Sequence, residues 1–136
     1  MEALPLRVSP DQDLRRALEG AVEARLSRAA FVISGIGSLR HAWLRWAGAA
    51  QPKSLDGDLE ILTLAGSVSR DGSHLHMSVA DTEGRVCGGH VAYGCTVRTT
   101  AEVLLLLLPE WSFTREVDPA TGFSELVVRK YIEIER

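Results

Sequence analysis

The connections between the β-rich stretches of this chain are too short to bring a following strand back in the same direction. His74 to Ala80 is separated by the four residues DTEG from the stretch Arg85 to Val97, and DPATG separates two further stretches near the C-terminus. A parallel pair of strands needs a crossover of roughly a dozen or more residues. Strands joined by such turns must run antiparallel, so we expect a largely antiparallel sheet.

Two segments favour helices between these strands. The first begins at the candidate N-cap Ser9 and then has apolar residues every three or four positions. The second, TTAEVLLLLLP, begins at Thr99 or Thr100 and stops at Pro109. Strands interleaved with two helices predict a single α+β domain over residues 1–136.

Two further stretches bear on the sheet. GDLEILTLAG, from Gly57 to Gly66, is apolar on both alternating sides, which predicts a central strand. GIGSL, from Gly35 to Leu39, follows a β-rich run and is interpreted as a tight turn. Its backbone N–H groups could also cradle an anion, although it lacks the lysine of a phosphate-binding loop.

Composition narrows the functional class. The net charge of −3 argues against non-specific nucleic-acid binding, which needs a surplus of Lys and Arg on one face. The run VLLLLL is far shorter than the roughly 20 residues that span a bilayer, and the N-terminus does not resemble a signal peptide. The two cysteines, Cys87 and Cys95, do not form a disulfide framework. We expect a cytoplasmic protein without a membrane role.

Three of the four histidines lie within 17 residues of one another. His74 and His76 are two apart, so their side chains project from the same face of a strand. His90 lies on the partner strand and joins that face if the loop has an odd length, or if a bulge forms at Gly88-Gly89. We expect all three imidazoles to converge, which would suit zinc or another divalent metal with an open fourth position.

Several other side chains have competing interpretations. Histidines on a sheet can be hydrogen-bonded without any metal, and His41 is isolated and expected on the surface. Cys87 could be a fourth ligand, but its strand parity favours a buried thiol. Glu102 could act as a base, although stabilising a helix start is favoured. Arg115 could bind an anionic ligand or form a structural ion pair.

The ordered set of motifs resembles a known family. GIGSL, GDLEIL, HLHMSVADTEGRVCGGHV, TTAEV and FTREVDPATGFSEL occur in the order found in the plants-and-prokaryotes conserved (PPC) domain, and the resemblance extends from about Leu6 to Leu126. It implies a compact, homotrimeric domain built on a largely antiparallel sheet. It also implies a metal site near a subunit boundary at His74, His76 and His90.

The resemblance leaves three functional hypotheses. We favour a homotrimeric binding protein with a zinc-like site that accepts a small anionic ligand. A metal-dependent hydrolase or lyase acting on a small anionic substrate is the alternative, with no catalytic residue identified. DNA binding is the third, but plant members read DNA through a separate AT-hook, and this chain contains no Arg-Gly-Arg-Pro motif. In GDLEIL, Asp58 and Leu59 replace the Arg and Phe of the plant partner-docking stretch.

Overall fold

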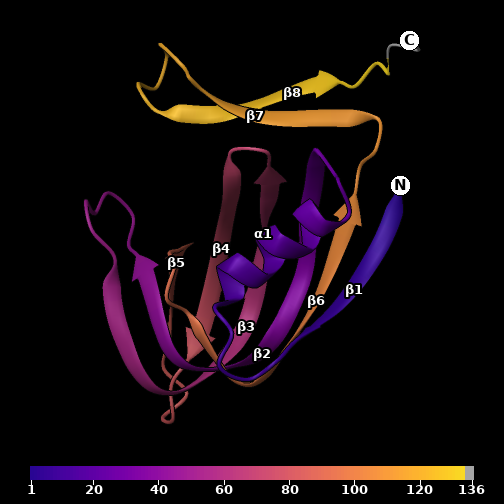
Figure 1. Ribbon diagram of the computed structural model, residues 1–136. Coiled ribbons are helices and arrows are strands. Elements are labelled where there is room, and N and C mark those ends of the chain that lie inside the picture. Colours follow the sequence, from indigo (N-terminus) through magenta and orange to yellow (C-terminus); the bar gives the residue numbers. More distant parts are fainter. Residues whose placement is uncertain (134–136) are drawn as a thin grey trace.

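A computed structural model describes residues 1–133, which form mostly β-structure (Figure 1). Within this range one helix, α1 (Leu14–Ala24), follows the first strand. The strands are β1 (Glu2–Val8), β2 (Ala29–Arg45), β3 (Lys53–Ser69), β4 (Gly72–Ala80), β5 (Val86–Val91), β6 (Thr96–Leu107), β7 (Trp111–Val117) and β8 (Ser124–Lys130).

The main sheet has the order β1-β6-β2-β3-β4-β5, and each neighbouring pair is antiparallel. This confirms the expected antiparallel sheet and the interior position of β3. The last strand in this order, β5, also pairs with the end of β2, where Arg45 lies opposite His90. The sheet curves around α1, and the separate β7–β8 hairpin lies across one end of it (Figure 1).

The core lies between α1 and the face of the sheet that the helix covers. Leu14, Leu18 and Val22 recur every four residues along α1 and are all buried. They belong to one apolar cluster with residues from the main sheet, among them Leu75 and Leu105. Burial of such a continuous apolar surface is the main stabilising contribution in a domain of this size.

The helix begins later than the sequence predicted. Ser9 is not the N-cap; Asp13 is, and its carboxylate accepts a hydrogen bond from the Arg16 N–H. The preceding residues pair with β6 instead, because the Asp11 N–H donates to the Val97 carbonyl and the Val97 N–H donates to the Gln12 carbonyl. Residues 9–12 therefore form a turn, in which Asp11 has a φ of +71°, and these backbone bonds anchor the turn to β6 ahead of Asp13.

Asp13 ties the helix start to the sheet, because its second carboxylate oxygen accepts a hydrogen bond of 2.6 Å from the Gly94 N–H. Replacing Asp13 with alanine should therefore destabilise the protein by about 1–2 kcal/mol, the upper part of the range for a lost N-cap. Urea unfolding measures the change. Asp58→Ala removes an equal charge from an exposed ion pair with Arg98 and should cost no more than about 1 kcal/mol. Equal losses in the two variants would contradict this role for Asp13.

The second predicted helix is wrong: residues 96–107 form strand β6. Val103, Leu105 and Leu107 point into the core, while Leu104 points to the other face and is 40% exposed. Because β6 lies between β1 and β2, its backbone is hydrogen-bonded on both sides. The helix prediction rested on a candidate cap at Thr99 or Thr100 and a stop at Pro109. A run of identical apolar residues hides the alternation that marks a strand.

The predicted turn at GIGSL is also wrong, because these residues continue strand β2. The pairing of β2 with β6 shifts register between Val32 and Ser34, and again on both sides of Leu39. Such bulges bend a strand and increase its twist. The glycine-rich stretch therefore belongs to the curved part of the sheet, and its strand geometry supports neither a tight turn nor an anion-binding loop.

The described residues, 1–133, contain no helix that is both long enough and apolar enough to cross a membrane.

Candidate metal centre

The β4–β5 hairpin positions the three histidines. Ala80 lies opposite Val86, so five residues form the loop and His76 lies opposite His90. Asp81 holds this loop, because its carboxylate accepts hydrogen bonds of 2.9 Å from the N–H groups of Glu83 and Arg85. The odd-length loop, one of the two expected alternatives, sets the register, and the pairing runs through Gly88 and Gly89 without a bulge.

All three imidazoles lie on the face of the sheet opposite α1. Leu75 and Met77 point into the core, so His74 and His76 alternate to the other side. His90 joins them from β5, and its ring stacks on that of His74 with centroids 4.9 Å apart. The predicted convergence of the three side chains is therefore confirmed.

The spacing of the ring nitrogens fits a metal ion. Nε2 of His74 is 3.2 Å from Nδ1 of His90 and 3.2 Å from Nε2 of His76, and one nitrogen from each ring lies within 4.8 Å of the others. Zinc–nitrogen bonds of about 2.0–2.1 Å place tetrahedral ligands roughly 3.3 Å apart. The two separations of 3.2 Å therefore match the spacing of imidazole nitrogens around a zinc ion.

Hydrogen bonds between the rings would explain the close approach of these nitrogens less well than a bound metal ion. Nε2 of His74 faces a second ring nitrogen on each side. A neutral imidazole nitrogen carries either one proton or one lone pair, so it can make only one good hydrogen bond in the ring plane. A cation that accepts a lone pair from each ring satisfies all three nitrogens at once.

The surroundings of His74 and His90 favour the uncharged form of these two imidazoles by lowering the pKa of each. Burial is the largest cause lowering the pKa of His74, and the positive charge of Arg115 is the next, while Glu125 acts weakly in the opposite direction. Burial, followed by the charge of Arg45, lowers the pKa of His90. Neutral imidazole is the form that binds a metal, so these shifts reduce competition from protons.

The other candidates lie elsewhere. His41 bonds to Asp56 at the surface, away from the cluster. Cys87 lies opposite Val79 and packs against the core, which confirms the thiol interpretation over a fourth ligand. Burial raises the pKa of the second thiol, Cys95, to about 11. Glu102 is exposed on β6, so its expected place at a helix start was wrong.

Sequence reasoning missed one residue beside the cluster and undervalued another. Arg45 was not considered, yet it ends β2 opposite His90. For Arg115 an anionic ligand and a structural ion pair were both open; its guanidinium donates to Ser67 Oγ at 2.9 Å and lies near His74. Nothing in the local sequence marks Arg45, because its position depends on the pairing of β2 with β5.

This chain matches a protein family and is similar to several solved structures. The family model of the Plants and Prokaryotes Conserved (PCC) domain matches residues 1–109. A hypothetical protein from Salmonella has a solved structure that is 36% identical, with a TM-score of 0.93 over 96% of this chain and 95% of that one. A metal-containing protein from Archaeoglobus fulgidus is 29% identical, with a TM-score of 0.82 over 93% and 94% of the two chains.

A curated relative is much longer. The Bifunctional protein GlmU of a Synechococcus strain is 45% identical over 98% of this chain, but the match covers only 21% of that protein. The chain therefore spans about a fifth of the length of this relative.

Proposed function

Because the chain belongs to the PCC domain family, we propose that it is a homotrimeric binding module that holds one divalent metal ion, zinc, on His74, His76 and His90. The convergence of three imidazole nitrogens within 4.8 Å of one another carries this proposal. The metal-containing relative from Archaeoglobus fulgidus, of similar fold, supports it.

The chain's own residues would supply three nitrogen ligands and leave one coordination position open. A bound ion would provide a Lewis acid at that position. The hairpin fixes the direction of all three rings, since His76 and His90 are directly paired and His74 is two residues along the same strand. His76 is exposed whereas His74 and His90 are half-buried, so the open position can be reached from outside.

Exposed apolar side chains support the trimer. Ile33, Ile36, Leu62 and Leu104 are each 40–52% exposed, and they lie on β2, β3 and β6 in the interior of the main sheet. These three strands are neighbours in the sheet, and exposed apolar patches commonly mark protein–protein interfaces. A symmetric assembly of three copies would remove these side chains from water.

Light scattering combined with metal analysis of the same sample tests the proposal. Protein without a histidine tag is stripped with a chelator, reloaded with zinc and passed over a size-exclusion column. We expect three times the mass of one chain and one zinc ion per chain. A monomer, or a trimer that keeps no zinc after removal of the excess, would refute the corresponding half of the proposal.

A further inference from the structure

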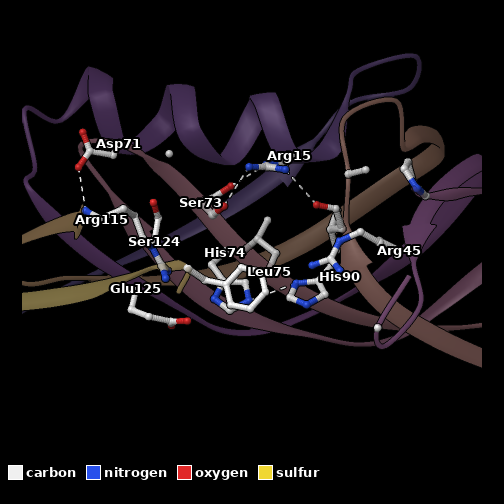
Figure 2. A pocket seen from close by; sticks show the side chains of 16 residues that line it. Arg15, Arg45, Asp71, Ser73, His74, Leu75, His90, Arg115, Ser124 and Glu125 are labelled. Carbon is white, nitrogen blue, oxygen red and sulfur yellow. Dashed lines mark hydrogen bonds between the residues drawn. The ribbon is translucent and has the colours of Figure 1, made fainter. Parts of the chain in front are cut away.

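A pocket of about 890 Å³ adjoins the histidine cluster (Figure 2). Its lining comes from α1, β4, β5, the end of β2 and the β7–β8 hairpin, and includes His74 and His90. Three arginines, Arg15, Arg45 and Arg115, also line it. This volume is in the range of pockets that bind small molecules.

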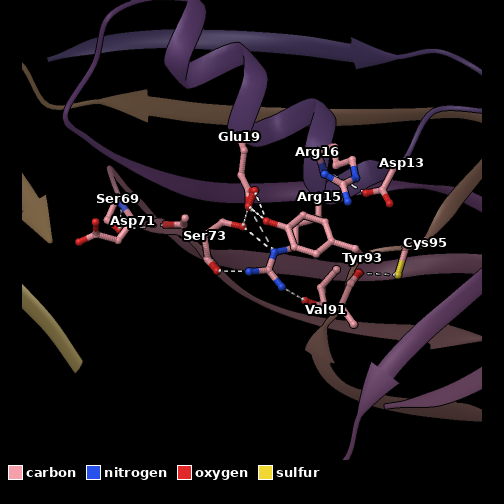
Figure 3. A network of polar contacts seen from close by, with 12 residues as sticks. Asp13, Arg15, Arg16, Glu19, Ser69, Asp71, Ser73, Val91, Tyr93 and Cys95 are labelled. Carbon is pink, nitrogen blue, oxygen red and sulfur yellow. Dashed lines mark hydrogen bonds and ion pairs between the residues drawn. The ribbon is translucent and has the colours of Figure 1, made fainter. Parts of the chain in front are cut away.

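Arg15 is committed to holding the structure together. Its guanidinium donates to the Ser73 hydroxyl, the Ser73 carbonyl and the Val91 carbonyl at 3.0–3.2 Å, and it forms an ion pair of 3.4 Å with Glu19 (Figure 3). Each of its three nitrogens donates one of these bonds, and Glu19 neutralises its charge. Arg15 therefore forms one wall of the pocket and is not a candidate for binding a ligand.

Arg45 and Arg115 are in a different situation. Arg45 donates to the Ala49 carbonyl at 3.1 Å, and Arg115 donates to Ser67 Oγ at 2.9 Å. Within residues 1–133, the ion pairs include neither guanidinium. Each guanidinium has five N–H donors, so most of the donors of both remain available.

The two guanidinium groups flank the histidines. Figure 2 shows Arg45 beside His90, while Arg115 lies on the side of His74. Two carboxylates are also present: Asp71 accepts from the Arg115 backbone N–H at 2.8 Å, and Glu125 lies near His74. The negative charges of these two carboxylates offset the positive charges of Arg45 and Arg115. A divalent ion on the imidazoles would then give the pocket an excess of positive charge.

We propose that this pocket binds a small oxyanion, a carboxylate or a phosphate group, between Arg45 and Arg115 and against His74 and His90. The proposal rests on the metal site proposed above. Planar guanidinium groups bind both kinds of anion through paired hydrogen bonds, which are stronger than those between neutral groups. An oxygen of the anion can also reach the open coordination position, so the arginines select ligands that carry negative charge.

Cobalt-loaded protein provides the test, because the visible spectrum of cobalt(II) responds to a new ligand. The wild type is titrated with inorganic phosphate and, separately, with acetate at constant ionic strength. We expect at least one anion to change the spectrum with saturation, and the tighter of the two identifies the class. Arg115→Gln and Arg45→Gln should each raise the dissociation constant about tenfold or more, the equivalent of one charge-assisted hydrogen bond.

Two further variants sharpen the result. Arg98→Gln removes the same charge at an exposed site that pairs with Asp58, and it should bind the anion like the wild type. Arg115→Lys keeps the positive charge but lacks the paired N–H donors of a guanidinium. Its dissociation constant for the anion should lie between those of the wild type and Arg115→Gln. Thermal unfolding checks that every variant is folded.

The outcomes separate the two proposals. Failure of the wild type to take up cobalt would refute the metal site and this inference together. Uptake of cobalt without a response to either anion would refute only the inference. An equal effect of Arg98→Gln and Arg115→Gln would also overturn it, because general charge would then explain the binding.

Discussion

Replacing His76 with alanine should lower zinc affinity by at least about 100-fold, because even residues that merely orient a ligating histidine commonly contribute 10–100-fold. In the proposed site His76 is one of three ligands from residues 1–133, and its Nε2 lies 3.2 Å from Nε2 of His74. The side chain is exposed, so its truncation leaves no cavity in the core. The zinc content of the variant after gel filtration should fall from about one ion per chain to nearly none.

His41→Ala is the matched control, since it removes the same type of side chain from a site bonded to Asp56. It should keep the zinc content of the wild type. A second readout comes from unfolding: excess zinc should raise the melting temperature of the wild type and of His41→Ala, because a ligand that binds only the folded state stabilises it. Retention of zinc by His76→Ala would refute the assigned ligand set.

Replacing Gly66 with alanine should destabilise the protein by about 3–5 kcal/mol, which is a large part of the stability of an ordinary domain. Gly66 has a φ of +154°, which side chains with a Cβ rarely adopt. An added Cβ would lie 2.0 Å from the His74 carbonyl oxygen and 2.8 Å from the Leu75 Cα. Both atoms belong to the backbone, so relief requires β3 and β4 to separate.

Urea unfolding with and without zinc measures this effect. The separation of β3 and β4 would displace His74, so Gly66→Ala should also weaken zinc binding. Gly20→Ala is the control: it lies in α1 with no atom within 4 Å of the added Cβ, and it should stabilise the protein by about 0.5–1 kcal/mol. A free energy of unfolding for Gly66→Ala within about 1 kcal/mol of the wild-type value would contradict the close approach of β3 and β4 at this position.

The histidine site was predictable because it depends on local rules. The spacing of His74 and His76 fixes a common face by strand alternation alone. For His90 the sequence left two alternatives, and the five-residue loop held by Asp81 selects one of them. The spacing of the residues suggested a metal, and recognising the family strengthened that expectation.

The errors arose where the sequence pattern was ambiguous. The leucine run of β6 is compatible with a helix or a strand, since every position is apolar. Backbone pairing with β1 and β2 makes it a strand. GIGSL contains two glycines that are typical of turns, yet it lies in the middle of a 17-residue strand. In both places contacts with distant strands outweigh local preference.

The sequence by itself determined the antiparallel pairing, the early helix and the shared face of His74 and His76, because these follow from turn length and residue periodicity. Only the tertiary structure brought Arg45 and Arg115 beside the imidazoles, since one ends β2 and the other lies on a separate hairpin. Their positions depend on how the sheet curves and on where β7 and β8 cross it. Such long-range geometry comes from packing of the whole chain and leaves no periodic pattern in the sequence around either arginine.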